Sequence, residues 1–144
     1  MYLKLGKLCA SVLAAAMITG CASGLNSMQE REYRAMEAAD VLVEEKDPSV
    51  GAALGILPGG GSFYARSPGL GVVNLLFWPL SILWDPISGY NGSMAINYDM
   101  TKHHLKREMQ AELSRLDDQL ALEELDRHQY VTKKRAIESK YDFN

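Results

Sequence analysis

Few side chains in this sequence of 144 residues have the type and spacing that chemistry requires. The adjacent His103 and His104 would point about 100° apart on a helix, so they could not bind one metal ion together. His128 stands alone, and no serine lies in the strained strand-to-helix turn that exposes a nucleophile. The glycines at 59–61 are not followed by the Lys-Ser or Lys-Thr pair of a phosphate loop. We therefore expect no enzymatic activity, no metal, no cofactor and no small-molecule substrate.

The chain has two cysteines, Cys9 and Cys21, and the first lies in an apolar run, Leu8–Ile18. Two lysines precede this run, and small residues follow it. A basic head, about a dozen apolar residues and a small-residue junction are typical of a secretory signal. The run is too short for a spanning helix, which needs ~20 apolar residues.

The junction Ile18-Thr19-Gly20-Cys21 resembles the bacterial lipobox. This resemblance implies that diacylglycerol is attached to the thiol of Cys21, that the chain is cut between Gly20 and Cys21, and that the new amine is acylated. The alternative is an ordinary signal peptide with an incidental cysteine. Because the next residue is Ala22 and not Asp, the sorting rule of enteric bacteria implies an outer-membrane lipoprotein that faces the periplasm.

Hydrophobic residues make up 47% of the chain, charged residues 23%, and the net charge is -3. The mild acidity argues against a nucleic-acid partner, which requires a basic patch. The length allows one domain, or one small domain with a helical extension. Hydrophobic and charged residues occupy separate blocks, which predicts four segments. They are a signal peptide at 1–20, a lipidated tether with an amphipathic helix at 21–47, an apolar hairpin at 48–92 and an amphipathic helical arm at 93–144.

In the second segment, Ser27-x-x-Glu30 is a capping-box pattern, and the composition predicts a helix over 28–46. The apolar face of this helix is narrow, so we expect it to lie on another part of the protein. Asp47-Pro48 ends the helix and suits the N-cap and first turn of a new one.

The stretch 48–84 carries a single charged residue, Arg66. Two apolar runs, 50–57 and 70–84, predict the two helices of a hairpin, with a glycine-rich turn between them. Trp78-Pro79 is expected to kink or break the second helix. We expect a loop over 87–92, where Asn-Gly favours a turn.

This block resembles the small two-transmembrane hairpin family of bacteria. The matching residues are Pro58, Gly59, Gly61, Phe63, Tyr64, Gly69, Gly71, Trp84 and Asp85. The resemblance implies a membrane-embedded hairpin and no activity. Because ~15 residues reach only about 23 Å, we expect the hairpin to enter one leaflet beside the lipid anchor or to pack against partner copies. The alternative is a buried, soluble hairpin. The candidate membrane residues are Pro58, Gly59, Gly61, Phe63, Tyr64, Trp78 and Trp84.

In the last segment, Ser93 could cap a helix that runs from Met94 to Arg127. Apolar residues at helical spacing form one stripe, which is expected to be either core or a seam for a partner helix. The stripe consists of Leu105, Met109, Leu113, Leu116 and Leu120.

The tail, with Leu116, Leu120 and Leu125 before Tyr130-Val131-Thr132 and a charged helix, resembles the SHOCT domain. The resemblance implies a small helical hairpin that mediates oligomerisation or docking, with Thr132 as N-cap of its second helix. The usual turn glycine is replaced by His128-Gln129, and basic residues follow Thr132 where acidic ones are usual. A simple amphipathic helix is the alternative.

Together these patterns predict an all-α protein: a short membrane-associated hairpin, a long amphipathic helix and a short terminal helix. We expect a lipid-anchored structural or interaction module that contacts membrane lipid and either a second copy or an envelope protein. One alternative is an accessory subunit of a transport or secretion complex. Another is a soluble carrier of lipid or another hydrophobic ligand. Crosslinking from the apolar stripe would identify a partner.

Overall fold

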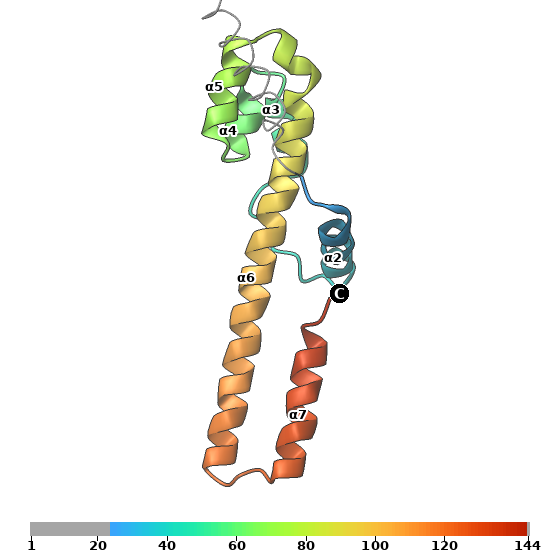
Figure 1. Ribbon diagram of the computed structural model, residues 1–144, viewed down its shortest axis with the longest axis vertical. Helices are drawn as coiled ribbons and strands as arrows, with labels where there is room; N and C mark the ends of the chain where they lie inside the picture. The colour runs from blue at the N-terminus through green and yellow to red at the C-terminus, as the bar shows by residue number, and fades with distance from the viewer. Residues whose placement is uncertain (1–23, 144) are drawn as a thin grey trace, which may run out of the picture. The chain divides into compact units, whose positions relative to one another are not determined.

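The computed structural model describes residues 24–143, and all regular secondary structure in this range is helical (Figure 1). The all-α prediction is therefore confirmed for the described residues. The chain divides into two compact units. We call residues 24–26 and 44–96 the head, and residues 27–43 and 97–143 the arm. The predicted signal peptide, Gly20 and Cys21 lie outside the described residues.

The head consists of short helices instead of the two apolar helices that the sequence predicts. These are α3 (Pro48–Leu54), α4 (Gly60–Tyr64), α5 (Pro68–Leu76), the 3₁₀ helix η1 (Leu80–Leu83) and the beginning of α6 (Asp85–Ala121). The predicted glycine-rich turn contains α4. The second apolar run is split between α5 and η1 at the cis Trp78-Pro79 bond, because proline lacks the N–H that would continue a helix.

The prediction that Asp47-Pro48 begins a new helix is confirmed at the start of α3. One carboxylate oxygen of Asp47 accepts hydrogen bonds from the backbone N–H groups of Ser49 at 2.7 Å and Val50 at 3.3 Å. Pro48 stands at the first helical position, where its missing N–H costs nothing.

Glycines let the backbones of α3 and α6 touch. A Cβ placed on Gly89 would lie 2.2 Å from the carbonyl oxygen of Gly51, and a Cβ on Gly51 would lie 2.5 Å from that of Gly89. Gly59 has a positive φ of 71°, and a Cβ there would lie 2.2 Å from the carbonyl oxygen of Gly71. Residues without side chains are therefore what allow the head to pack so closely.

The predicted loop over 87–92 and the predicted cap at Ser93 are both wrong. Helix α6 begins at Asp85 and continues through these residues, and the buried Ser93 hydroxyl donates to the Gly89 carbonyl oxygen at 2.7 Å. Packing against α3 outweighs the local turn preference of Asn-Gly here. The helix also ends at Ala121, before the predicted Arg127, and Glu123 follows with a φ of 57°.

The arm contains α2 (Ser27–Ala38), the remainder of α6, and α7 (Arg127–Lys140), which runs antiparallel to α6 (Figure 1). Helix α2 is shorter than the predicted 28–46, and Asp40 beyond its end has a φ of 56°.

The N-cap of α7 is Asp126, not the predicted Thr132. The Asp126 carboxylate accepts from the Gln129 N–H at 2.8 Å, and the Gln129 side chain accepts from the Asp126 N–H at 3.2 Å. Thr132 lies inside α7, where its hydroxyl donates to the His128 carbonyl oxygen at 2.9 Å. Because of this reciprocal capping box, the N-cap lies six residues earlier than the predicted Thr132.

Candidate functional site

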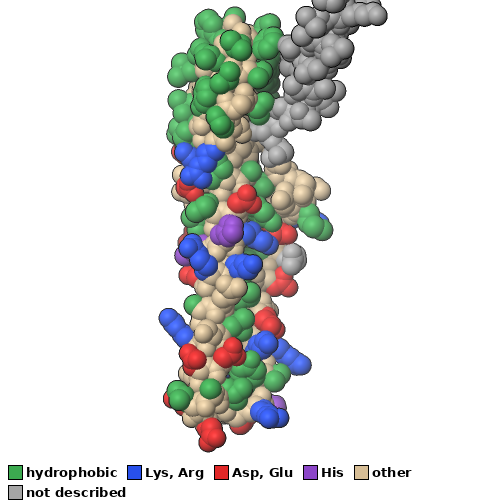
Figure 2. Space-filling view, turned by 60° about the vertical axis from the view of Figure 1, so that its left-hand side comes forward, with side chains coloured by type: hydrophobic (Ala, Val, Ile, Leu, Met, Phe, Trp, Pro, Cys, Tyr) green, Lys and Arg blue, Asp and Glu red, His purple; other side chains and the backbone are tan. Residues whose placement is uncertain are grey.

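Large apolar side chains cover the surface of the head. Figure 2 shows them over the visible face of this unit. Leu76 is 75% exposed and Leu83 is 74% exposed. The other exposed apolar residues of the head are Val50, Ile56, Leu57, Phe63, Val72, Val73, Leu75, Trp78, Leu80, Ile87 and Tyr90. Large apolar patches are uncommon on water-soluble monomers and are typical of surfaces that contact a membrane or another protein.

The interior of the head is polar. Its buried polar residues are Ser62, Asn74, Ser81, Asp85, Ser88 and Ser93. Leucine, isoleucine and valine normally fill the interior of a water-soluble domain, whereas aspartate is almost never fully buried without partners. The head therefore has its polarity inverted, with polar groups inside and apolar groups outside.

The inverted interior is organised around Asp85, which is completely buried. Its carboxylate accepts hydrogen bonds from the N–H groups of Gly61 at 3.1 Å and Ser62 at 3.0 Å. It also accepts from the Ser62 hydroxyl at 2.5 Å and from the Asn74 side-chain amide at 2.7 Å. These four donors satisfy a charged group that would otherwise be costly to bury.

Asn74 extends the network to an aromatic ring. Its amide also donates to the Ser62 hydroxyl at 2.9 Å, and its carbonyl oxygen accepts from the indole N–H of Trp84 at 2.8 Å. Sequence reasoning missed Ser62 and Asn74 and gave Asp85 no role beyond a motif match. The sequence did contain one indication of this network: Asp85 is an acidic residue at the end of a nearly charge-free stretch. An ionisable side chain in apolar surroundings needs hydrogen-bond or ion-pair partners.

Apart from the buried Asp85, the charged residues of the head lie at 44–47 and at Arg66. We call five residues of this region the charged edge: Glu45, Lys46, Asp47, Tyr64 and Arg66. Arg66 forms an ion pair with Glu45. The Lys46 ammonium lies 4.5 Å from the centre of the Tyr64 ring. The Tyr64 hydroxyl accepts a hydrogen bond from the Asp47 N–H at 3.1 Å. Tyrosine with lysine and arginine is the composition found where protein crosses from lipid to water.

The structure distributes the seven predicted membrane residues over four environments. Phe63 and Trp78 are exposed on the apolar surface. Tyr64 belongs to the charged edge, and Trp84 is half-buried against Asn74. The remaining three lie in or near the turn between α3 and α4: Gly59 and Gly61 are buried, and Pro58 is half-buried.

In the arm, a buried carboxylate joins α2 to α6. Glu32 accepts hydrogen bonds from the Lys102 ammonium at 2.8 Å and the Tyr98 hydroxyl at 2.7 Å. The bond from Lys102, followed by the bond from Tyr98, lowers the pKa of Glu32 from its usual value. Burial, with the bond to Glu32, raises the pKa of Tyr98 to about 12. Tyr33 and Met36, which follow Glu32 in α2, are also buried. Together with the bonds of Glu32, they explain why α2 lies on α6.

The apolar stripe of α6 serves the packing of the arm itself. Leu105 and Leu116 are buried, and Met109, Leu113 and Leu120 are half-buried. Polar contacts hold α7 along the same helix. Glu112 accepts from Lys140 at 2.6 Å and from the Tyr141 hydroxyl at 3.0 Å, and these bonds lower its pKa. The stripe was expected to be either core or a seam for a partner helix. The burial of Leu105 and Leu116 favours the core.

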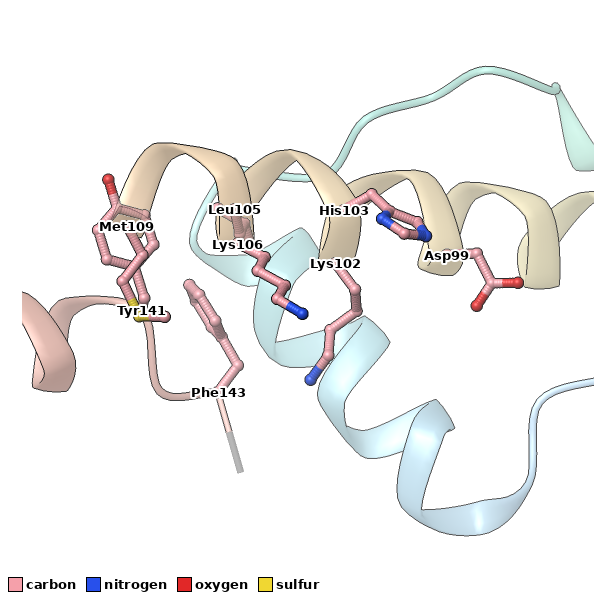
Figure 3. Close-up of a pocket in the computed structure, with 8 residues that line it drawn as sticks. All are labelled: Asp99, Lys102, His103, Leu105, Lys106, Met109, Tyr141 and Phe143. Carbon is pink, nitrogen blue, oxygen red and sulfur yellow. The ribbon is translucent and has the colours of Figure 1, made fainter. Parts of the chain in front are cut away.

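A hollow of about 350 Å³ opens on the arm between α6 and the segment after α7 (Figure 3). Leu105 and Met109 contribute its apolar lining, and Phe143 lies across from them. In Figure 3, Lys102 and Lys106 extend from α6 toward the side on which Phe143 lies. The other residues around the hollow are Asp99, His103 and Tyr141. Lys102 already donates to Glu32, and Leu105 and Met109 belong to the predicted apolar stripe, so the hollow is formed largely by residues that pack the arm.

Among the described residues there is neither a metal-binding group of side chains nor a helix able to span a membrane. Within residues 24–143, no group of three or more His, Cys, Asp or Glu side chains is arranged to hold a metal ion. No helix in that range combines the length and apolar character needed to cross a membrane.

Comparison with known proteins gives no further guide to this site. No family model, no curated protein and no solved structure matches the chain. The resemblances to the lipobox, to the two-transmembrane hairpin family and to the SHOCT domain remain predictions from the sequence.

Proposed function

We propose that this protein is a lipid-anchored bacterial envelope protein that acts as a structural or interaction module. In this proposal Cys21 carries the lipid, the head adds a second attachment to the membrane, and the arm faces the periplasm. The outer membrane is the proposed location, because Ala22 follows the cysteine. An enzymatic role, a cofactor and a nucleic-acid partner are not part of the proposal.

The single observation that carries the proposal is the inverted polarity of the head. Its outer surface holds Leu76, Trp78 and Leu83, while Asp85 and Asn74 are inside. Exposing this much apolar surface to water is unfavourable by about 25 cal/mol per Å², so a partner or a bilayer must cover it. A lipid on Cys21 and an inserted apolar surface would supply the two signals that stable anchoring requires.

Labelling of cells with a clickable palmitate analogue tests the lipid attachment. Wild type and Cys9→Ala should both incorporate the label, since Cys9 lies in the predicted signal peptide. Cys21→Ala should incorporate none and should keep the size of the uncleaved precursor. The attachment is refuted if wild type carries no label, or if Cys21→Ala reaches mature size and stays membrane-bound.

Photocrosslinking in intact cells tests the interaction role of the arm. Leu122 and Val131 are exposed apolar residues of the arm, so a photoreactive residue at either position leaves the core intact. We expect a discrete adduct, either with a second copy or with one envelope protein. The stripe itself is a poorer site for the crosslinker, because Leu105 and Leu116 are buried. Absence of any adduct from both positions would count against an interaction module.

The alternative is an accessory subunit of a membrane transport or secretion complex. The exposed apolar residues of the head favour this reading if they pack against transmembrane segments of other proteins. Purification from membranes in mild detergent separates the two proposals. A stoichiometric transporter or secretion protein supports the subunit, whereas a chain that purifies alone or with its own copies supports the anchored module.

A further inference from the structure

The charged edge and the most exposed leucines of the head lie at opposite ends of α5. Arg66, in the charged edge, precedes the first residue of this helix by two positions. Leu76 is the last residue of the helix, and the chain then exposes Trp78, Leu80 and Leu83. We call these four residues the apolar tip. Figure 1 shows α5 running between the turn that follows α4 and the segment that leads into α6.

The length of α5 sets the separation between the two features. Its nine residues, at 1.5 Å per residue, extend about 14 Å. The hydrocarbon core of a bilayer is about 30 Å thick, so one leaflet contributes about half of that. The head is therefore charged at one end and apolar over a depth close to that of a single leaflet.

We propose that the head inserts into one leaflet of a bilayer, with the charged edge among the lipid headgroups and the apolar tip among the acyl chains. This inference rests on the proposed function and adds the depth and the orientation of the attachment. Lys46 and Arg66 would lie where ammonium and guanidinium groups reach water and lipid phosphates, and Tyr64 would lie at the boundary.

The spread of the exposed apolar side chains favours lipid over a protein as the covering partner. They come from α3 (Val50), from α5 (Val72), from η1 (Leu83) and from the first turn of α6 (Ile87). A single protein interface covers one patch of a surface. Acyl chains surround an inserted object, so they cover apolar groups on all of these elements at once.

The interior of the head meets the main requirement for a place among acyl chains. Lipid offers no hydrogen bonds, so polar groups at that depth must be satisfied within the protein. The four donors to the Asp85 carboxylate do this, and the Ser93 hydroxyl donates to a backbone carbonyl oxygen. The Ser81 hydroxyl is the one exception among the described residues.

Single nitroxide labels on the full chain test the depth and orientation. The parent is Cys9→Ala, in which Cys21 is the only remaining cysteine. Leu76→Cys and Leu83→Cys place labels on the apolar tip, Glu44→Cys places one beside the charged edge, and Gln110→Cys places one on the arm. All four positions are exposed, so the labels disturb little packing. The proteins are reconstituted into vesicles of phosphatidylethanolamine and phosphatidylglycerol.

Collision with oxygen, which concentrates among acyl chains, is compared with collision with a water-soluble nickel chelate. We expect labels at Leu76 and Leu83 to favour oxygen several-fold, and labels at Glu44 and Gln110 to favour the chelate. The parent should take up no label if Cys21 carries a thioether, and vesicle flotation reports attachment independently.

The possible failures are distinguishable. If the chain does not float with vesicles, the proposed attachment itself fails. If the chain floats but the tip labels favour the chelate, the inference is overturned and attachment survives. Tip labels that are shielded from both reagents and broadened by a neighbouring nitroxide would show a second copy over the tip, which also overturns it. An oxygen-favouring label at Glu44 would contradict insertion into one leaflet.

Discussion

The hydroxyl of Ser62 donates a hydrogen bond of 2.5 Å to the carboxylate of Asp85, across 23 positions of sequence. Both residues are completely buried. The bond connects the short helix α4 to the first residue of α6, and the backbone N–H of Ser62 donates to the same carboxylate. A charged group thus holds together a unit whose exterior is apolar, so the fold of the head depends on its polar interior.

Replacement of Asp85 by alanine should destabilise the head by about 3 kcal/mol, because it leaves the N–H groups of Gly61 and Ser62 without their acceptor. Limited proteolysis in detergent micelles, with cleavage mapped to residues 44–96, measures the loss. Asp118→Ala, at an exposed position of the same helix, is the matched control and should behave as wild type. Equal protease resistance of the two variants would show that the network is not what holds the head together.

Alanine at Gly89 should also destabilise the head, by about 2 kcal/mol, because its Cβ would lie 2.2 Å from the Gly51 carbonyl oxygen. Gly69 is the control, since a Cβ there meets nothing within 4 Å. Gly69→Ala should be neutral or stabilising by up to about 1 kcal/mol, because alanine favours a helix over glycine. Denaturant unfolding of the two variants in micelles gives the comparison, and the opposite order would contradict the close packing of α3 on α6.

The sequence predicted those features of the fold that depend on neighbouring residues. Asp47-Pro48 marks a helix start through a side chain that bonds to its own next turn, and the leucine spacing marks the long helix. The helix through Asn91-Gly92 was missed because its cause is a contact with Gly51, far away in the chain. The charge-free block predicted an apolar surface, but hydropathy does not say which side chains turn outward. The pairing of Ser62 and Asn74 with Asp85 was therefore beyond sequence reasoning.

The arm should lose stability in acid through Glu32. Its pKa in the folded chain is below the ordinary value of 4.5, so its contribution is complete above that value and is lost as the pH falls through the folded pKa. Glu32→Gln should lower the melting temperature near pH 7, and its difference from wild type should shrink below about pH 4.5.

Circular dichroism of thermal unfolding between pH 7 and pH 3 measures this difference. Glu37→Gln, at an exposed position of the same helix, is the control and should follow wild type throughout. A constant gap between wild type and Glu32→Gln across this range would mean that the bonds from Lys102 and Tyr98 do not couple to the protonation of Glu32.

Leu116 should be the more important of two leucines near the end of the arm. It is buried, so Leu116→Ala should cost about 2 kcal/mol. Leu122 is exposed, and Leu122→Ala should change stability by no more than about 0.5 kcal/mol. Hydrogen exchange of the amides in α7 reports the loss locally. If both substitutions left exchange unchanged, the stripe would not be the core of the arm and would be free to bind a partner helix.

The fluorescence of Trp78 tests the central claim, that the apolar surface of the head contacts lipid. Trp78 and Trp84 are the two tryptophans of the chain, so the emission lost in Trp78→Phe is that of Trp78. With the full chain bound to vesicles, this emission should be quenched by lipids brominated on the acyl chains and should be protected from iodide in the water. Quenching by iodide, with no effect of the brominated chains, would contradict the account.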